Sequence, residues 1–200
     1  LAPTFLEAVG LTKPEMMTAR SLMNLFQGKE FDDQKAAYIA MERHDGCRQG
    51  GKGYPCRAIR TQDYLYIHNF EPSRWPSGSP DAAVCARSIP YGEIDSSPTK
   101  SFMMEHRNQH GVARLAELAF GMRPAEELYD VKNDPHQLRN VAGSVSMIEV
   151  QQSLRRRLFD HLKETEDPRV VGGDIEWDHY PYYGRISTKG WSVDAKGRNE

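Results

Sequence analysis

The chain has 200 residues, of which 38% are hydrophobic and 27% are charged. This composition is typical of a globular protein with a hydrophobic core and excludes wholesale disorder. A formal net charge of −2 gives no strong basic field, which argues against nucleic acid as a partner. No apolar run in the sequence is long enough to cross a bilayer, so no membrane span is expected.

A short apolar helix is predicted at the start of the chain, over residues 2–9. Pro3 suits the first turn of a helix, and Gly10 suits the position after its last turn. Phe5 and Val9 give this segment a mostly apolar face, and so short a helix is not stable in isolation. We therefore expect it to be buried against a larger body.

Four segments have the pattern of β-strands. Residues 35–43 are apolar on both faces until Glu42, which favours an inner strand of a sheet. Residues 56–60 and 64–69 form the clearest hairpin, and residues 126–131 add a further short strand. Together they predict an antiparallel sheet.

Long loops and helices make up the rest. Residues 71–100 are rich in proline and predict a long irregular excursion, after which residues 101–120 return to helical spacing. The last long helix is expected from about 147 to 165, with Ser146 and Glu149 as a capping box at its start. The predicted fold class is α+β, with an antiparallel sheet, a packed C-terminal helix and long loops.

The cysteines do not decide the redox compartment. Cys47, Cys56 and Cys85 are odd in number, so they cannot all pair within the chain. Cys47 and Cys56 flank a Gly-rich stretch and are spaced to allow a disulfide, but free thiols are the favoured interpretation.

No residue pattern indicates a metal or a nucleophile. His106 and His110 have the spacing of zinc ligands on a helix, but Arg107 stands where a metalloprotease needs Glu, and no third ligand is evident. Residues 50–53 lack the spacing of a phosphate-binding loop, and no nucleophile elbow is present. The sequence therefore predicts no catalytic residue and no metal ligand in this chain.

Arg43 and His44 are the first candidates for binding. They follow Glu42, where a predicted strand runs out into a Gly-rich loop, which is a common place for a binding side chain on a rigid scaffold. Arginine pairs bidentately with sulfate or carboxylate, and histidine exchanges protons near neutral pH. A plain surface Arg–His pair is the alternative interpretation.

Several segments together resemble sulfatases of the alkaline phosphatase superfamily. The matching segments are LAPTFLEAVG at 1–10, TARSL at 18–22, and ELYD at 127–130 followed by NDP at 133–135 and NVA at 140–142. Two more, GYPCRAIR at 53–60 and KETEDP at 163–168, are similar to the sulfamidase (heparan N-sulfatase)-type branch.

The resemblance implies a two-part fold. Residues 1–30 would be the end of an N-terminal catalytic α/β domain, residues 31–170 the C-terminal sulfatase subdomain with a four-stranded antiparallel sheet and a helix, and residues 171–200 a tail. The expected partners are a sulfated small molecule or glycan and the chain's own N-terminal catalytic domain. The expected location is periplasmic or extracellular.

The resemblance also implies a chemistry whose residues lie upstream of this chain. The family uses a formylglycine nucleophile and a calcium ion as cofactor. Cys85 does not fit the modification motif, because Arg87 and Ile89 stand where Pro or Ala and Arg are required. We therefore expect a sulfuric ester or sulfamidate hydrolase as the full-length protein, and no activity in this piece alone.

Six residues are the expected substrate contacts. The resemblance places the loop after Glu42 at the substrate pocket, and the proline-rich excursion adds side chains that stack on or pair with a sugar; the six are His44, Arg43, Lys52, Tyr54, Arg74 and Trp75. Two alternatives stay open: another hydrolase of the superfamily, such as a phosphodiesterase or phosphonate monoester hydrolase, and a non-catalytic glycan-binding module.

Overall fold

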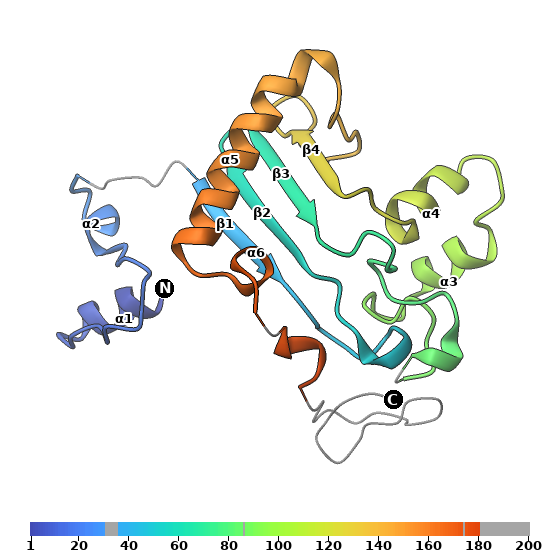
Figure 1. Ribbon diagram of the computed structural model, residues 1–200, viewed down its shortest axis with the longest axis horizontal. Helices are drawn as coiled ribbons and strands as arrows, with labels where there is room; N and C mark the ends of the chain where they lie inside the picture. Colours follow the sequence, from blue (N-terminus) through green and yellow to red (C-terminus); the bar gives the residue numbers. More distant parts are fainter. Residues whose placement is uncertain (31–35, 86, 174, 181–200) are drawn as a thin grey trace. The chain divides into compact units, whose positions relative to one another are not determined.

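The computed structural model describes residues 1–30, 36–85, 87–173 and 175–180 (Figure 1). Most of the expected tail over 171–200 lies outside the described residues. The chain divides into two compact units, Leu1–Lys35 and Ala36–Glu200. Among the described residues, no helix has the length and apolarity to span a membrane.

The first unit contains two short helices, α1 (Ala2–Ala8) and α2 (Met23–Phe26). The expected opening helix is confirmed as α1, and Thr4 links the two helices because its Oγ1 accepts the N–H of Leu22 at 3.0 Å. Phe5 is exposed within this unit, so the apolar face of α1 finds no cover there. The assignment of residues 1–30 to a catalytic domain stays a prediction.

The second unit is built on a four-stranded antiparallel sheet in the order β1-β2-β3-β4. The strands are β1 (Ala36–Met41), β2 (Cys56–Thr61), β3 (Tyr64–Asn69) and β4 (Glu126–Asp130). The hairpin of β2 and β3 and the strand β4 are confirmed close to their predicted bounds. This meander with a packed helix is the α+β class that the sequence predicted.

The position of β1 corrects one expectation. The apolar run over 35–43 predicted an inner strand, but β1 lies at the edge of the sheet and pairs only with β2 among the described strands. Tyr38 and Ile39 are 40% and 50% exposed. An apolar pattern on both faces does not distinguish an inner strand from an edge strand, and one backbone edge of β1 has no strand beside it among the described residues.

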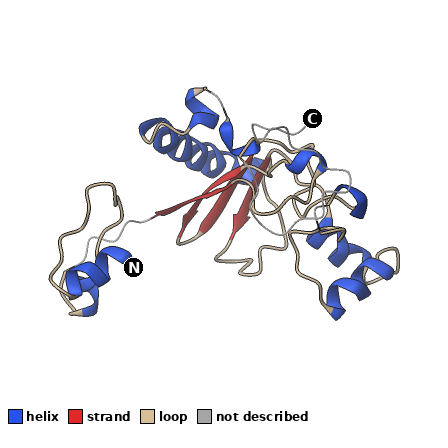
Figure 2. Cartoon of the chain, turned by 90° about the horizontal axis from the view of Figure 1, so that it is seen from below, coloured by secondary structure: helices blue, strands red, loops and turns tan. Residues whose placement is uncertain are grey.

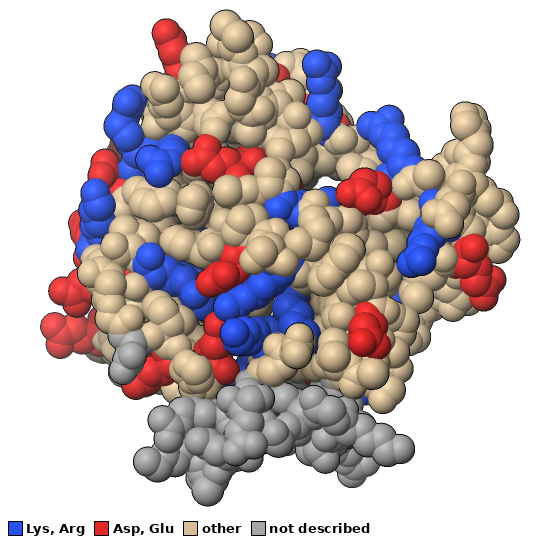
Figure 3. Space-filling model, turned by 45° about the vertical axis from the view of Figure 1, so that its right-hand side comes forward, with Lys and Arg blue, Asp and Glu red and all other residues tan. Residues whose placement is uncertain are grey.

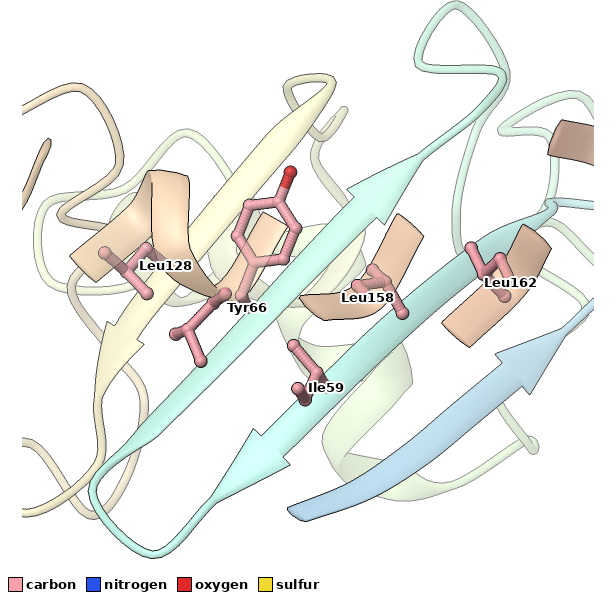
Figure 4. Packing of buried hydrophobic residues seen from close by; sticks show 6 residues of the cluster. Ile59, Tyr66, Leu128, Leu158 and Leu162 are labelled. Atoms are coloured by element: carbon pink, nitrogen blue, oxygen red, sulfur yellow. The ribbon is translucent and has the colours of Figure 1, made fainter. Parts of the chain in front are cut away.

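The helix α5 (Ile148–Glu164) covers one face of the sheet (Figures 1 and 2). Leu154, Leu158 and Leu162 recur every fourth residue, so they share the stripe that faces the strands. Figure 4 shows this stripe against three buried strand residues, which come from β2, β3 and β4: Ile59, Tyr66 and Leu128. Burial of these side chains provides the main hydrophobic stabilisation of the unit.

The start of α5 corrects a second expectation. A 3-10 turn over Val145–Met147 (η3) precedes the helix, and Met147 is the N-cap without a side-chain hydrogen bond. Ser146 therefore lies inside this turn and does not cap the helix with Glu149. The side chain of Gln151 accepts the N–H of Gly143 at 2.8 Å and ties the preceding loop to α5.

A second, smaller core forms beyond the ends of β3 and β4 (Figure 1). It lies under α3 (Pro98–Glu105) and α4 (Ala113–Phe120), where the ring of Tyr91 stacks on that of Phe120 with centroids 4.7 Å apart. The proline-rich excursion, with its short turn η2 (Ala82–Val84), therefore packs against its own hydrophobic cluster.

The helical spacing predicted over 101–120 corresponds to two helices, because the chain breaks between α3 and α4. Gly111 adopts φ +87° in the connecting turn, a conformation incompatible with a continuous right-handed helix. His106 caps α3, and His110 lies in the turn, so the two histidines share no helix. Their zinc-like spacing has no structural meaning here.

His68 gives the fold a testable pH dependence. Its ring lies edge-on to Phe70 and Phe159, and burial lowers the pKa of His68 although Glu126 Oε1 lies 3.9 Å from its Nδ1. The folded state therefore resists protonation, whereas the unfolded chain takes up a proton near pH 6.5. Stability is thus full above this pH and falls as the pH drops through it.

We expect the free energy of unfolding, measured by urea denaturation at pH 7.5 and pH 5.5, to fall more on acidification in the native protein than in His68→Gln. The substitution removes the titrating group and keeps a polar side chain of similar length. Identical losses in the two proteins would contradict a neutral buried His68.

Candidate functional site

A buried ionic network fixes the point where β1 leaves the sheet. Arg57 on β2 is 2% exposed, and its Nε donates to Asp167 Oδ2 at 2.6 Å while its Nη2 donates to Glu42 Oε1 at 2.7 Å. Arg169, on the short helix α6 (Pro168–Val171), holds the other oxygen of Glu42. The start of the loop after β1 is therefore held by two cations and cannot move independently of β2 and α6.

Arg48 organises the loop itself. This side chain is buried, and it donates to the carbonyl oxygens of Trp75 at 2.6 Å and Pro76 at 2.7 Å. Its Nη1 also lies 2.9 Å from Glu93 Oε1, and the other oxygen of Glu93 lies 2.7 Å from His44 Nδ1. One arginine thus joins the loop after β1 to two parts of the proline-rich excursion.

Close packing around Cys47 holds the same layer together. Gly78 has φ +90°, and a Cβ there would meet Gly92 N at 2.8 Å and Cys47 Sγ at 3.1 Å. Cys85 donates from its Sγ to the carbonyl oxygen of Cys47 at 3.3 Å. The expectation of free thiols is confirmed for all three cysteines, so hydrogen bonds and packing, not a disulfide, join these loops.

The loops enclose an open pocket of 650 Å³. It lies between the short turn η1 (Gln49–Gly51) and the excursion, and its walls carry a lysine, two arginines, an indole ring and several small polar side chains. The lining residues are Arg48, Gln49, Gly50, Lys52, Ser73, Arg74, Trp75, Ser79, Asp81 and Val84. Figure 3 shows basic side chains gathered with acidic ones among them on one face of the molecule.

Three of the six predicted contacts come together in this pocket: Lys52, Arg74 and Trp75. Lys52 is exposed, and its Nζ has no ion-pair partner within the described part of the chain. Trp75 packs against the smaller core, where its ring makes a T-shaped contact with Tyr91 at 6.0 Å between centroids. An aromatic ring beside polar and cationic side chains is a suitable surface for an anionic sugar.

The other three predicted contacts lie outside the lining of the pocket. His44 is 75% exposed in its side chain and is held by Glu93. Arg43 donates to the carbonyl oxygen of Tyr180. Tyr54 is 2% exposed, and its hydroxyl is buried without a hydrogen-bond partner among the described residues, so its present position suits a support for the loop.

A short segment near the C-terminal end of the described chain crosses the same loops. This segment, residues 176–180, includes the turn η4 (Glu176–Asp178), and we call it the clasp. The carboxylate of Asp178 accepts the N–H of Gly53 at 2.9 Å and the Nη1 of Arg74 at 3.1 Å. The clasp therefore binds Arg74, which lines the pocket, and Gly53, which follows the lining residue Lys52, without lining the pocket itself.

The residues that the structure describes hold no group of three His, Cys, Asp or Glu side chains suitable for a metal ion. Cys85 is buried. The cationic and aromatic lining of the pocket has the chemistry to recognise an anionic ligand.

Sequence reasoning missed the four charged residues that build the site: Arg48, Arg57, Glu93 and Asp178. Each has at least one partner 28 or more residues away in the chain, although Arg57 also binds Glu42, which lies only 15 residues before it. The one available signal was Arg57, since a charged residue between apolar neighbours on a β-strand indicates a buried, paired charge.

No family model matches the chain. Two curated ulvan-active sulfatases of Formosa agariphila do: one is 25% identical over 170 residues, and the other is 24% identical over 162 residues. The matches cover 82% and 78% of this chain, but the chain spans only 28% and 24% of the length of these two relatives.

A solved structure supports the fold. BT4656, in complex with its substrate D-glucosamine-2-N,6-O-disulfate, has a TM-score of 0.50 and 20% identity over 86% of this chain and 25% of that one. The four-stranded sheet with its packed helix is thus the fold found at the C-terminal end of sulfatase structures.

The Arg57 network gives a stability prediction. Arg57→Met leaves Glu42 and Asp167 without their buried partner, so we expect the free energy of unfolding to fall by about 3–5 kcal/mol. Arg155→Met is the control, because the Arg155–Glu126 pair is half-exposed and is expected to contribute less than about 1 kcal/mol. Equal losses in urea denaturation would show that the buried network contributes no more than a surface pair.

Proposed function

We propose that the protein containing this chain hydrolyses sulfate esters or N-sulfates of a glycan. The proposal starts from the premise that this chain corresponds to the C-terminal region of sulfatases. The observation that carries the proposal is the match to curated sulfatases over 82% of this chain. The relatives' names point to sulfated carbohydrates as the substrate class, and the pocket with Lys52, Arg74 and Trp75 has the chemistry to bind one.

We propose that the reactive groups lie outside this chain. The nucleophile, expected to be a formylglycine, and the metal ion, expected to be calcium, require residues that the described part of the chain does not bring together. This chain's own contribution is recognition: the loop after β1 and the excursion form one wall of the substrate site, with Arg43 and His44 at its rim.

The sulfamidase-type branch is supported only by the two sequence segments that resemble it. GYPCRAIR contributes Gly53, Tyr54 and Arg57, and KETEDP ends with Asp167 and Pro168. Arg57 and Asp167 pair directly, at 2.6 Å, so the two segments form one structural element. Because this element stabilises the loop and does not line the pocket, it does not discriminate between an N-sulfate and an O-sulfate.

The full-length protein that contains this chain is expected to release inorganic sulfate from a sulfated oligosaccharide and from an aryl sulfate. The 200-residue chain alone is expected to release none. Sulfate release by the short chain would contradict the proposal. Hydrolysis of a phosphodiester to a phosphomonoester and an alcohol would favour another hydrolase of the superfamily, and binding of the oligosaccharide without hydrolysis would favour a glycan-binding module.

Lys52 tests the role of the pocket within that function. Lys52→Ala in the full-length protein should raise KM for the sulfated oligosaccharide about three- to tenfold with little change in kcat, because an exposed cation contributes about 1 kcal/mol to binding a charged group. Lys163→Ala, an exposed lysine on α5, is the matched control and should leave KM unchanged. An unchanged KM in Lys52→Ala would place the substrate elsewhere.

A further inference from the structure

The clasp holds Arg74 through a carboxylate that is itself well fixed. The side chain of Asp178 is 12% exposed, and Arg74 keeps a second contact, from its Nη1 to the carbonyl oxygen of Gly53 at 3.0 Å. Burial alone would raise the pKa of Asp178, but the Gly53 N–H and Arg74 together hold it below its usual value. Asp178 is therefore ionised at neutral pH, which is the form that both donors require.

The neighbouring residue anchors the clasp to the buried ionic network. The indole ring of Trp177 has the guanidinium of Arg57 at 5.6 Å from its centroid and that of Arg169 at 5.8 Å. Two cation–π contacts to buried arginines fix the ring strongly. Asp178 is thus attached to the same network that holds Glu42.

The contact point on the loop is equally constrained. A Cβ on Gly53 would come within 3.0 Å of the backbone of Glu42 and Arg43, so the loop returns tightly against the end of β1 at this residue. Lys52 immediately precedes Gly53, and both Lys52 and Arg74 line the pocket. Asp178 therefore holds Arg74 directly and Lys52 through the neighbouring Gly53.

We infer that Asp178 is a positioning residue for glycan recognition: by joining Gly53 to Arg74 it sets the separation of Lys52 and Arg74 across the pocket. This inference rests on the proposed function and adds to it a specific residue of the clasp. Asp178 does not line the pocket itself, so its effect on a ligand passes through the two residues that it holds.

An opposite role for Asp178 is also testable. A carboxylate bound to an arginine and a backbone N–H occupies donors that an anionic group of a substrate would use. If Asp178 were a competitor, its removal would strengthen substrate binding. The anchoring of Trp177 between two arginines argues against displacement of the clasp and favours the positioning role.

The experiment compares Asp178→Asn and Asp178→Ala in the full-length protein. Asparagine keeps an acceptor for the Gly53 N–H and loses the charge that faces Arg74, whereas alanine loses both. Glu176→Gln is the control, because Glu176 belongs to the same turn and its carboxylate accepts from the hydroxyl of Tyr180 in the clasp. KM and kcat are measured for a sulfated oligosaccharide and for a small aryl sulfate that lacks the sugar units the pocket is proposed to bind.

For the oligosaccharide we expect KM to rise about threefold in Asp178→Asn and about tenfold in Asp178→Ala, with kcat within about twofold of the native value. KM for the aryl sulfate and both constants of Glu176→Gln should not change. The graded rise confined to the longer substrate is a result that a general loss of folding would not produce.

Three results would overturn the inference. The first is an unchanged KM for the oligosaccharide, and the second is a lower KM, which would identify Asp178 as a competitor of the substrate. The third is an equal loss of kcat on both substrates, which would identify Asp178 as a purely structural residue. If the native protein hydrolyses neither substrate, the proposed function fails first, and the dissociation constant of the oligosaccharide, measured by calorimetry on the same variants, then tests the positioning role alone.

Discussion

The buried guanidinium of Arg57 is the constraint on which the rest of the second unit depends. Removing a charge from water costs several kcal/mol, and this cost is offset only where partners surround the ion closely. Arg57 finds these partners in Glu42 and Asp167, which come from opposite ends of the unit. The end of β1, the turn after α5 and the clasp therefore meet at this guanidinium. They contribute the carboxylate of Glu42, the carboxylate of Asp167 and the indole ring of Trp177.

The second unit is stabilised in two different ways, one in the sheet and α5 and the other in the loops. Between the sheet and α5, apolar side chains such as Ile59 and Leu158 pack in regular rows, and burial of apolar surface supplies the stability. In the loops beyond the sheet there is little regular structure, and side-chain donors bind backbone carbonyl oxygens in its place, as Arg48 does for Trp75 and Pro76. The sheet with α5 therefore forms a rigid support, and the loops beyond it form the charged surface that carries the pocket.

The sequence predicted the elements whose pattern is local. The leucine repeat of α5 and the alternation in the β2–β3 hairpin are set by neighbours a few residues apart, so both were predictable. The edge position of β1 was not predictable, because the sequence of an apolar strand has the same pattern whether a second strand or another surface lies beside it. The break after α3 depends on the left-handed conformation of Gly111, which the helical spacing on either side of it does not reveal.

The sequence predicted where the candidate site lies, but not the hydrogen bonds and ion pairs that hold it together. The exit of β1 at Glu42 pointed to the loop that supplies Lys52 to the lining of the pocket, although Arg43 and His44 lie outside that lining. The pairing of Asp178 with Gly53 and Arg74, by contrast, joins residues more than 100 positions apart, and no local pattern encodes it. Long-range charge pairs of this kind require the fold to be known first.

The three unpaired cysteines have a practical consequence. Burial raises the pKa of Cys47 and Cys85 above the usual value, and it raises the pKa of Cys56 to about 11. Almost no thiolate is then present at neutral pH, and the thiolate is the species that alkylating reagents and peroxide attack. We therefore expect the three thiols of the folded protein to react slowly with oxygen and with a maleimide dye, so that a rise in dye reactivity would report that its loops have opened.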